Sequence, residues 1–162
     1  MIETSRSALW PILSGGLIAG TLDILQACIL FGWDIPLAIA AGLLGKQAFQ
    51  GGGATYALGL VLHYFIATTA TAIYYAASRK LTFLSHNWIV CGLFFGIAVE
   101  LAMSLVVLPL SALHARGPYQ LHDLLLGLGM HMATIGLPVA FIVHRFSKVD
   151  QPVASIPVSK TA

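Results

Sequence analysis

Four long apolar stretches constrain this chain more than any other feature of its sequence. They cover residues 8–31, 55–77, 88–110 and 121–146. Each is long enough to cross a membrane, because a spanning helix needs about 20 apolar residues. Only 9% of the residues are charged and 58% are hydrophobic, whereas about 25% are charged in ordinary soluble domains. We therefore predict an all-α, polytopic membrane four-helix bundle, with one transmembrane domain over residues 1–150 and a flexible cytoplasmic tail over 151–162.

A shorter apolar segment lies between the first two stretches, at residues 34–49. It has helical spacing but is too short to span a bilayer. Three glycines at 51–53 end it and allow the chain to turn back. We expect a short helix at the membrane interface or a re-entrant segment.

The basic residues predict the orientation. Six of them lie in the N-terminal segment, the second loop and the C-terminal segment, and two lie in the other loops: Arg6, Arg79, Lys80, Arg145, Lys148 and Lys160 against Lys46 and Arg116. Because basic loops stay on the cytoplasmic side, both termini are predicted to be cytoplasmic. The net charge of +2 is small and gives no reason to expect nucleic acid as a partner.

A glycine-rich phrase occurs twice, as GGLIAGTLD at 15–23 and as GLFFGIAVE at 92–100. Each copy is followed by an apolar stretch with a Leu-Gly-Leu-x-x-His phrase, LGLVLH at 58–63 and LGLGMH at 126–131. Small residues at such spacing let membrane helices approach closely. The order of the phrases predicts two tandem helix-pair repeats, each with one acid and one histidine.

Those residues are Asp23, His63, Glu100 and His131. At about 1.5 Å per helical residue, all four lie near the middle of a hydrocarbon core about 30 Å thick. A charge facing lipid at that depth costs at least about 2.5–3.5 kcal/mol, so we expect the four side chains to point inward and form one buried polar cluster. Four further residues are expected to support the cluster through packing, hydrogen bonding or a helix kink: Gly20, Gln26, Gly96 and Pro138.

Three uses of such a cluster are physically sensible. The four side chains can bind a divalent transition metal, which imidazole ligands suit, or pass protons or another cation along a path. They can also neutralise one another in pairs and fix helix register. Our leading hypothesis is a membrane protein that binds or conducts a proton or metal ion. A haem-binding or redox subunit with His63 and His131 as axial ligands, and an accessory scaffold for a larger membrane complex or a homo-oligomer, are the alternatives.

The chain has none of the short motifs that mark nucleotide-driven or hydrolytic enzymes, such as GxxxxGK[ST], HExxH or GxSxG, so an enzyme is not favoured. The four stretches, together with GKQAFQGG at 45–52 and VVLPLSAL at 106–113, resemble uncharacterised small bacterial four-helix inner-membrane proteins. The resemblance implies a bacterial inner-membrane location and a multi-pass fold. It implies no activity and no catalytic residues.

Overall fold

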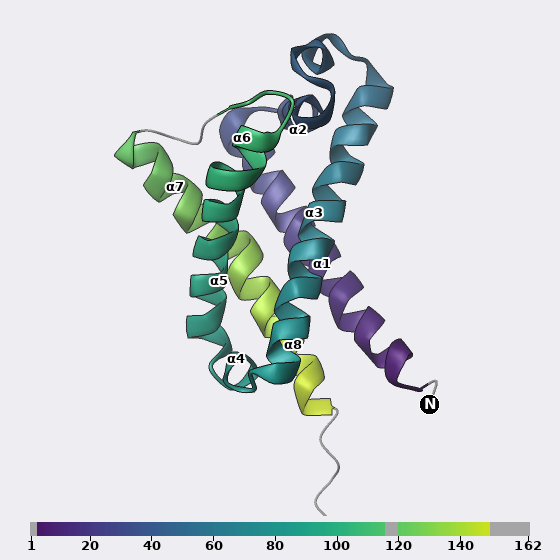
Figure 1. The fold of residues 1–162 in the computed structure, drawn as a ribbon, viewed down its shortest axis with the longest axis vertical. Coiled ribbons are helices and arrows are strands. Elements are labelled where there is room, and N and C mark those ends of the chain that lie inside the picture. The colour runs from purple at the N-terminus through teal and green to yellow at the C-terminus, as the bar shows by residue number, and fades with distance from the viewer. Residues whose placement is uncertain (1–2, 116–119, 150–162) are drawn as a thin grey trace, which may run out of the picture.

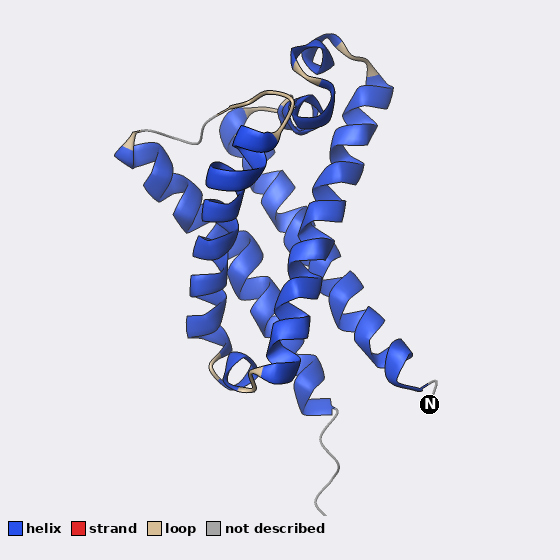
Figure 2. Ribbon diagram, in the orientation of Figure 1, coloured by secondary structure: helices blue, strands red, loops and turns tan. Residues whose placement is uncertain are grey.

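The computed structural model describes residues 3–115 and 120–149, and this part of the chain is helical with short turns and no strand (Figure 2). The predicted all-α class is confirmed. The helices run in the order α1 (Glu3–Phe31), α2 (Ile35–Leu44), η1 (Lys46–Gln50), α3 (Gly53–Lys80), α4 (Phe83–His86), α5 (Trp88–Ala102), η2 (Met103–Val107), α6 (Leu108–Leu110), α7 (Leu121–His131), η3 (Met132–Gly136) and α8 (Leu137–Val149).

Within the described residues, four helices are long and apolar enough to cross a membrane: Ala8–Phe31, Gly53–Lys80, Trp88–Leu110 and Leu121–Ser147. Many large apolar side chains stay exposed on their outer faces, including Ile29 at 74% and Phe65 at 67%. Such surfaces suit contact with lipid. The chain therefore has the features of a multi-pass membrane protein. The predicted tail at 151–162 lies outside the described residues.

The start of α1, the α4 turn and the end of α8 lie at one end of the molecule, and α2 and α6 lie at the other (Figure 1). This is the arrangement expected when four successive helices each cross the same layer. Arg79 and Lys80 end α3 at the first of these two ends.

The fourth long helix, formed by α7, η3 and α8, is the most buried of the four. It packs against both α1 and α5, and its second half also contacts α3 and α4. Val139, Ala140 and Val143 of α8 are completely buried, and they form one apolar core with Ala19 of α1 and Tyr74 of α3. The other three spanning helices all contact this one.

Glycines set the closest helix contacts. A Cβ atom added at Gly16 of α1 would lie 2.6 Å from the Cα of Thr68 in α3. One added at Gly96 of α5 would lie 2.5 Å from the Cα of Met132 in η3. Both distances are too short for any side chain, so the first glycine phrase packs on α3 and the second on the fourth long helix.

The segment after α1 forms α2, a ten-residue helix that folds back against α3. Pro36 lies in its first turn, where its missing N–H costs no hydrogen bond. The contact with α3 depends on Gly59, because a Cβ atom there would meet the backbone of Pro36. The predicted short helix is present, and it covers one end of the space between the long helices (Figure 1).

Candidate functional site

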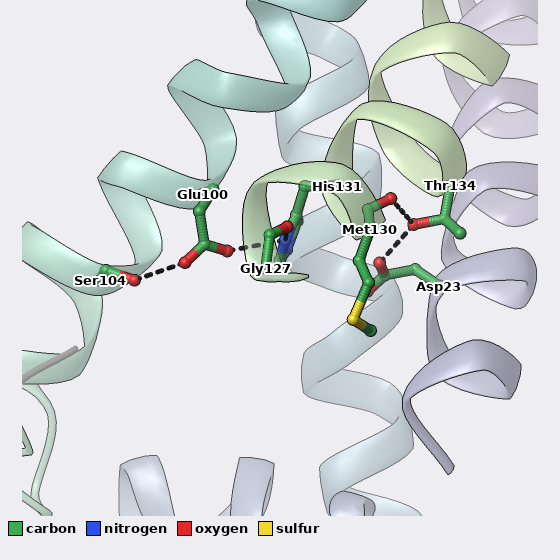
Figure 3. A network of polar contacts seen from close by, with 7 residues as sticks. All are labelled: Asp23, Glu100, Ser104, Gly127, Met130, His131 and Thr134. Atoms are coloured by element: carbon green, nitrogen blue, oxygen red, sulfur yellow. Dashed lines mark hydrogen bonds and ion pairs between the residues drawn. The ribbon is translucent and has the colours of Figure 1, made fainter. Parts of the chain in front are cut away.

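Glu100 and His131 form a buried pair between α5 and α7. His131 Nδ1 lies 2.8 Å from Glu100 Oε2, and the Glu100 residue is only 5% exposed. Ser104 donates its hydroxyl proton to Glu100 Oε1 at 2.8 Å, so each carboxylate oxygen has a donor (Figure 3). A buried carboxylate needs such partners, because an unpaired one would carry a large desolvation cost.

The partners of His131 Nδ1 assign its proton. This nitrogen also lies 3.2 Å from the carbonyl oxygen of Gly127, one turn earlier in α7. A carbonyl can only accept, so Nδ1 carries the hydrogen and Nε2 is left free. Gly127 has a second role: a Cβ atom there would lie 2.9 Å from Glu100 Oε1. The absence of a side chain at Gly127 makes room for the carboxylate.

Asp23 has a partner from the far end of the sequence. Thr134 Oγ1 lies 2.7 Å from Asp23 Oδ1 and 2.8 Å from the carbonyl oxygen of Met130 (Figure 3). Thr134 donates its one hydroxyl hydrogen to Asp23 Oδ1 and shares it with the carbonyl oxygen of Met130.

The expected contact between Gln26 and Asp23 is not formed. Thr134 takes the place beside the carboxylate, and Gln26 Oε1 is buried without a hydrogen-bond partner. Sequence spacing correctly placed Gln26 one turn from Asp23, but it could not show that a hydroxyl from the fourth long helix would reach the acid first.

His63 lies on α3 and contacts the first glycine phrase. Its Nε2 donates to the carbonyl oxygen of Gly20 at 2.8 Å, and its ring meets Tyr64 edge to face. As in His131, one ring nitrogen is fixed as a donor and the other is free. No contact joins His63 to Asp23, so the first acid and the first histidine do not form a pair like Glu100 and His131.

A cavity of about 180 Å³ lies between the long helices. Asp23, His63 and His131 line it, and the rest of its wall is apolar, with Ile35 and Ile39 of α2 on one side. Glu100 does not line the cavity itself, but it is bonded to His131, which does. Space for one water needs only about 10–15 Å³, so the cavity has room for several waters beside the three polar side chains.

Both hydroxyl partners of the carboxylates lie in π-helical turns. Ser104 lies in η2 and Thr134 in η3, and each segment is followed by a Leu-Pro pair, ending at Pro109 and Pro138. A proline lacks the N–H that would continue the regular bonding pattern, and π-turns are frequent at functional sites. The helix disturbance expected at Pro138 is present as a π-turn, and it recurs before Pro109.

The predicted metal site is not formed. Within residues 3–115 and 120–149, no three His, Cys, Asp or Glu side chains come together in a way that could hold a metal ion. The physical reason is that the four candidates already have other partners: Glu100 and His131 bind each other, Asp23 binds Thr134 and His63 binds Gly20.

The site does not fit haem either. His63 and His131 line the same cavity, but its volume of about 180 Å³ is below the range of about 300–1,000 Å³ typical of cofactor pockets. The size of the cavity therefore argues against the haem alternative.

Three residues of the site were not identified from the sequence: Ser104, Gly127 and Thr134. Ser104 follows Glu100 by four residues, a spacing that places both on one helix face. Gly127 belongs to the second Leu-Gly-Leu-x-x-His phrase and lies four residues before His131. These two signals were present in the sequence. Nothing local pointed to Thr134, because its partner Asp23 is 111 residues away.

Comparison of the chain with protein-family models, with curated proteins and with solved structures found no match.

Proposed function

We propose that this chain is a multi-pass membrane protein that takes up protons at its buried polar centre and conducts them across the membrane. The observation that most supports this proposal is the cavity lined by Asp23, His63 and His131, with Glu100 bonded to His131. Acids and histidines inside a membrane are costly and are the usual components of proton relays.

The hydrogen bonds support this proposal because they leave places for a mobile proton. His63 and His131 each have one nitrogen fixed as a donor and one free nitrogen that can accept a proton. Asp23 accepts from the Thr134 hydroxyl and lines the same cavity as the two histidines. Water in the cavity would connect these groups, since it has both donor and acceptor capacity.

The proposal includes the architecture that surrounds the centre. We place the four long helices in a bundle of two tandem helix pairs, because each glycine phrase packs on the helix that follows it. Sites of repeat-built transporters often lie where halves meet near mid-depth. The basic residues at the end that holds Arg79 and Lys80 support cytoplasmic termini, and the sequence resemblance supports a bacterial inner membrane.

Proton flux in proteoliposomes tests this function. Vesicles with the protein should dissipate an imposed pH gradient faster than empty vesicles, and the isosteric change Glu100→Gln should remove most of that difference, as should His131→Gln. His122→Gln is the matched control, because this histidine is 82% exposed and, among the described residues, bonds to Asp123 alone. Wild-type flux equal to that of empty vesicles, or full flux in both centre variants, would contradict proton passage.

A further inference from the structure

An apolar groove lies between α3 and α5. The two helices meet where the Tyr74 ring of α3 lies 4.8 Å from the Phe95 ring of α5. Otherwise α3 packs mainly on α1 and α2, and α5 packs on the fourth long helix. Between them lies a hollow of about 410 Å³ whose wall is almost entirely apolar. It continues into a second hollow of about 500 Å³ that is bounded by α2, η2 and α6.

The groove and the polar cavity share walls. Ile66 of α3 and Met103 of η2 line both hollows and also the cavity that holds Asp23, His63 and His131. The groove therefore runs along the outside of the polar centre within the membrane-spanning part of the chain. Phe65, which is 67% exposed, forms part of its rim, so the groove faces the bilayer.

The shape of the groove favours a lipid chain over a helix of a second copy. One turn of a helix about 10 Å across and 5.4 Å long fills roughly 400 Å³, as much as the whole hollow between α3 and α5. No glycine lines that hollow, whereas close helix contacts in this chain use glycine, as at Gly16 and Gly96. A flexible hydrocarbon chain needs neither the width nor the small residues.

The polar cavity determines which head group the bound lipid must have. A lipid without a head would bring hydrocarbon against Asp23 and two histidines, and leaving such groups without hydrogen-bond partners is costly. A charged head would itself cost at least about 2.5–3.5 kcal/mol at this depth. A small uncharged head with a hydroxyl or carbonyl oxygen avoids both costs. A hydroxyl can donate to a free ring nitrogen, and a carbonyl can accept from that nitrogen once it carries a proton.

We propose that the groove between α3 and α5 binds a single-chain lipid with a small uncharged oxygen-bearing head, which enters from the bilayer and places that head in the cavity of Asp23, His63 and His131. This site deepens the proposed function, on which it rests, by naming a ligand for the same polar centre. Its test measures binding and requires no proton flux.

Binding of radiolabelled decyl-benzoquinone to the protein in nanodiscs tests the site, with empty nanodiscs as background. The change Ala102→Phe should fill the groove and weaken specific binding by about tenfold. Ala98→Phe serves as a second blocking variant, since both alanines are exposed and line the groove. Leu101→Phe is the matched control, because Leu101 lies on the same helix, is 41% exposed and does not line the groove.

Two competitors test the role of the head. Unlabelled decyl-benzoquinone should displace the probe, whereas decylbenzene, which has the chain and ring but no oxygen, should compete at least about tenfold less well. Equal competition by decylbenzene would overturn the proposal, and so would unchanged binding in both blocking variants or binding no greater than in empty nanodiscs. Loss of flux with normal probe binding would overturn only the proposed proton passage.

Discussion

Two glycine-lined helix contacts, α1 on α3 (the first pair) and α5 on the fourth long helix (the second pair), differ in their polar contacts. In both, a glycine phrase on the first helix packs against the helix that follows it. In the second pair the acid and the histidine meet, with Glu100 and His131 at 2.8 Å. In the first pair they do not: Asp23 bonds to Thr134 of the other pair, and His63 bonds to the carbonyl of Gly20.

The two acids also differ in their position after the glycine. Asp23 is three residues after Gly20, and Glu100 is four residues after Gly96. With 3.6 residues per turn, one residue changes the direction of a side chain by about 100°. Both spacings return near the same helix face. In the structure both acids contact the fourth long helix, Glu100 at His131 and Asp23 at Thr134.

The comparison teaches that a repeated small-residue phrase can preserve helix contact while its polar residues diverge. The second pair holds a closed acid–histidine unit that is 5% exposed at Glu100. The first pair leaves Asp23 and His63 half-buried at the cavity. His131 of the second pair lines the same cavity, with Glu100 bonded to it.

The largest expected effect on stability is a difference between alanine substitutions of the two acids. Glu100→Ala leaves His131 and Ser104 without their shared partner and should lower the free energy of unfolding by about 3–5 kcal/mol. Asp23→Ala removes one hydrogen bond from a half-buried residue and should cost about 1–2 kcal/mol. Unfolding in detergent, followed by circular dichroism, measures both. Equal losses would break the distinction between the pairs.

An intermediate effect on stability is expected from alanine substitutions at the two glycine contacts. Gly96→Ala brings a Cβ atom to 2.5 Å from the Cα of Met132, where backbone must move, and should cost about 1–3 kcal/mol. Gly20→Ala meets the Tyr64 ring at 3.0 Å, and that side chain can shift, so the cost should stay below about 1 kcal/mol. The same unfolding measurement applies, and a larger loss at Gly20 would contradict the described packing.

The smallest expected effect concerns the link between the pairs. Asp23→Asn and Thr134→Ala should be coupled in a double-mutant cycle by about 0.6 kcal/mol, the typical value for such bonds between membrane helices. Independent effects of the two changes would show that the Asp23–Thr134 bond does not join the pairs in the folded protein.

Much of the fold could be predicted from the sequence because it depends on patterns that lie within one segment. The apolar stretches set the four long helices, and the break after Phe31 with the glycines at 51–53 set the short α2. The phrase around Gly96 indicated a close helix contact. The sequence spacing also placed His131 and Glu100 at similar depth, and in the structure they are in contact.

The remaining details depended on contacts between distant segments. Periodicity gives the depth of Asp23 but not the partner that faces it, so Thr134 was missed and Gln26 was wrongly expected beside the acid. The second π-turn, before Pro109, needed the backbone geometry of η2. The groove between α3 and α5 required the packing of all the long helices, which no single segment contains.

The most direct test of the central claim is ¹⁵N NMR of the histidine rings in detergent-solubilised protein over a pH titration. We expect Nδ1 of His131 to carry a hydrogen-bonded proton throughout, and Nε2 to gain and lose the exchangeable proton, with the Nδ1 signal shifted in Glu100→Gln. A His131 ring with its fixed proton on Nε2, or one whose signals do not respond to Glu100→Gln, would contradict a proton-holding acid–histidine pair.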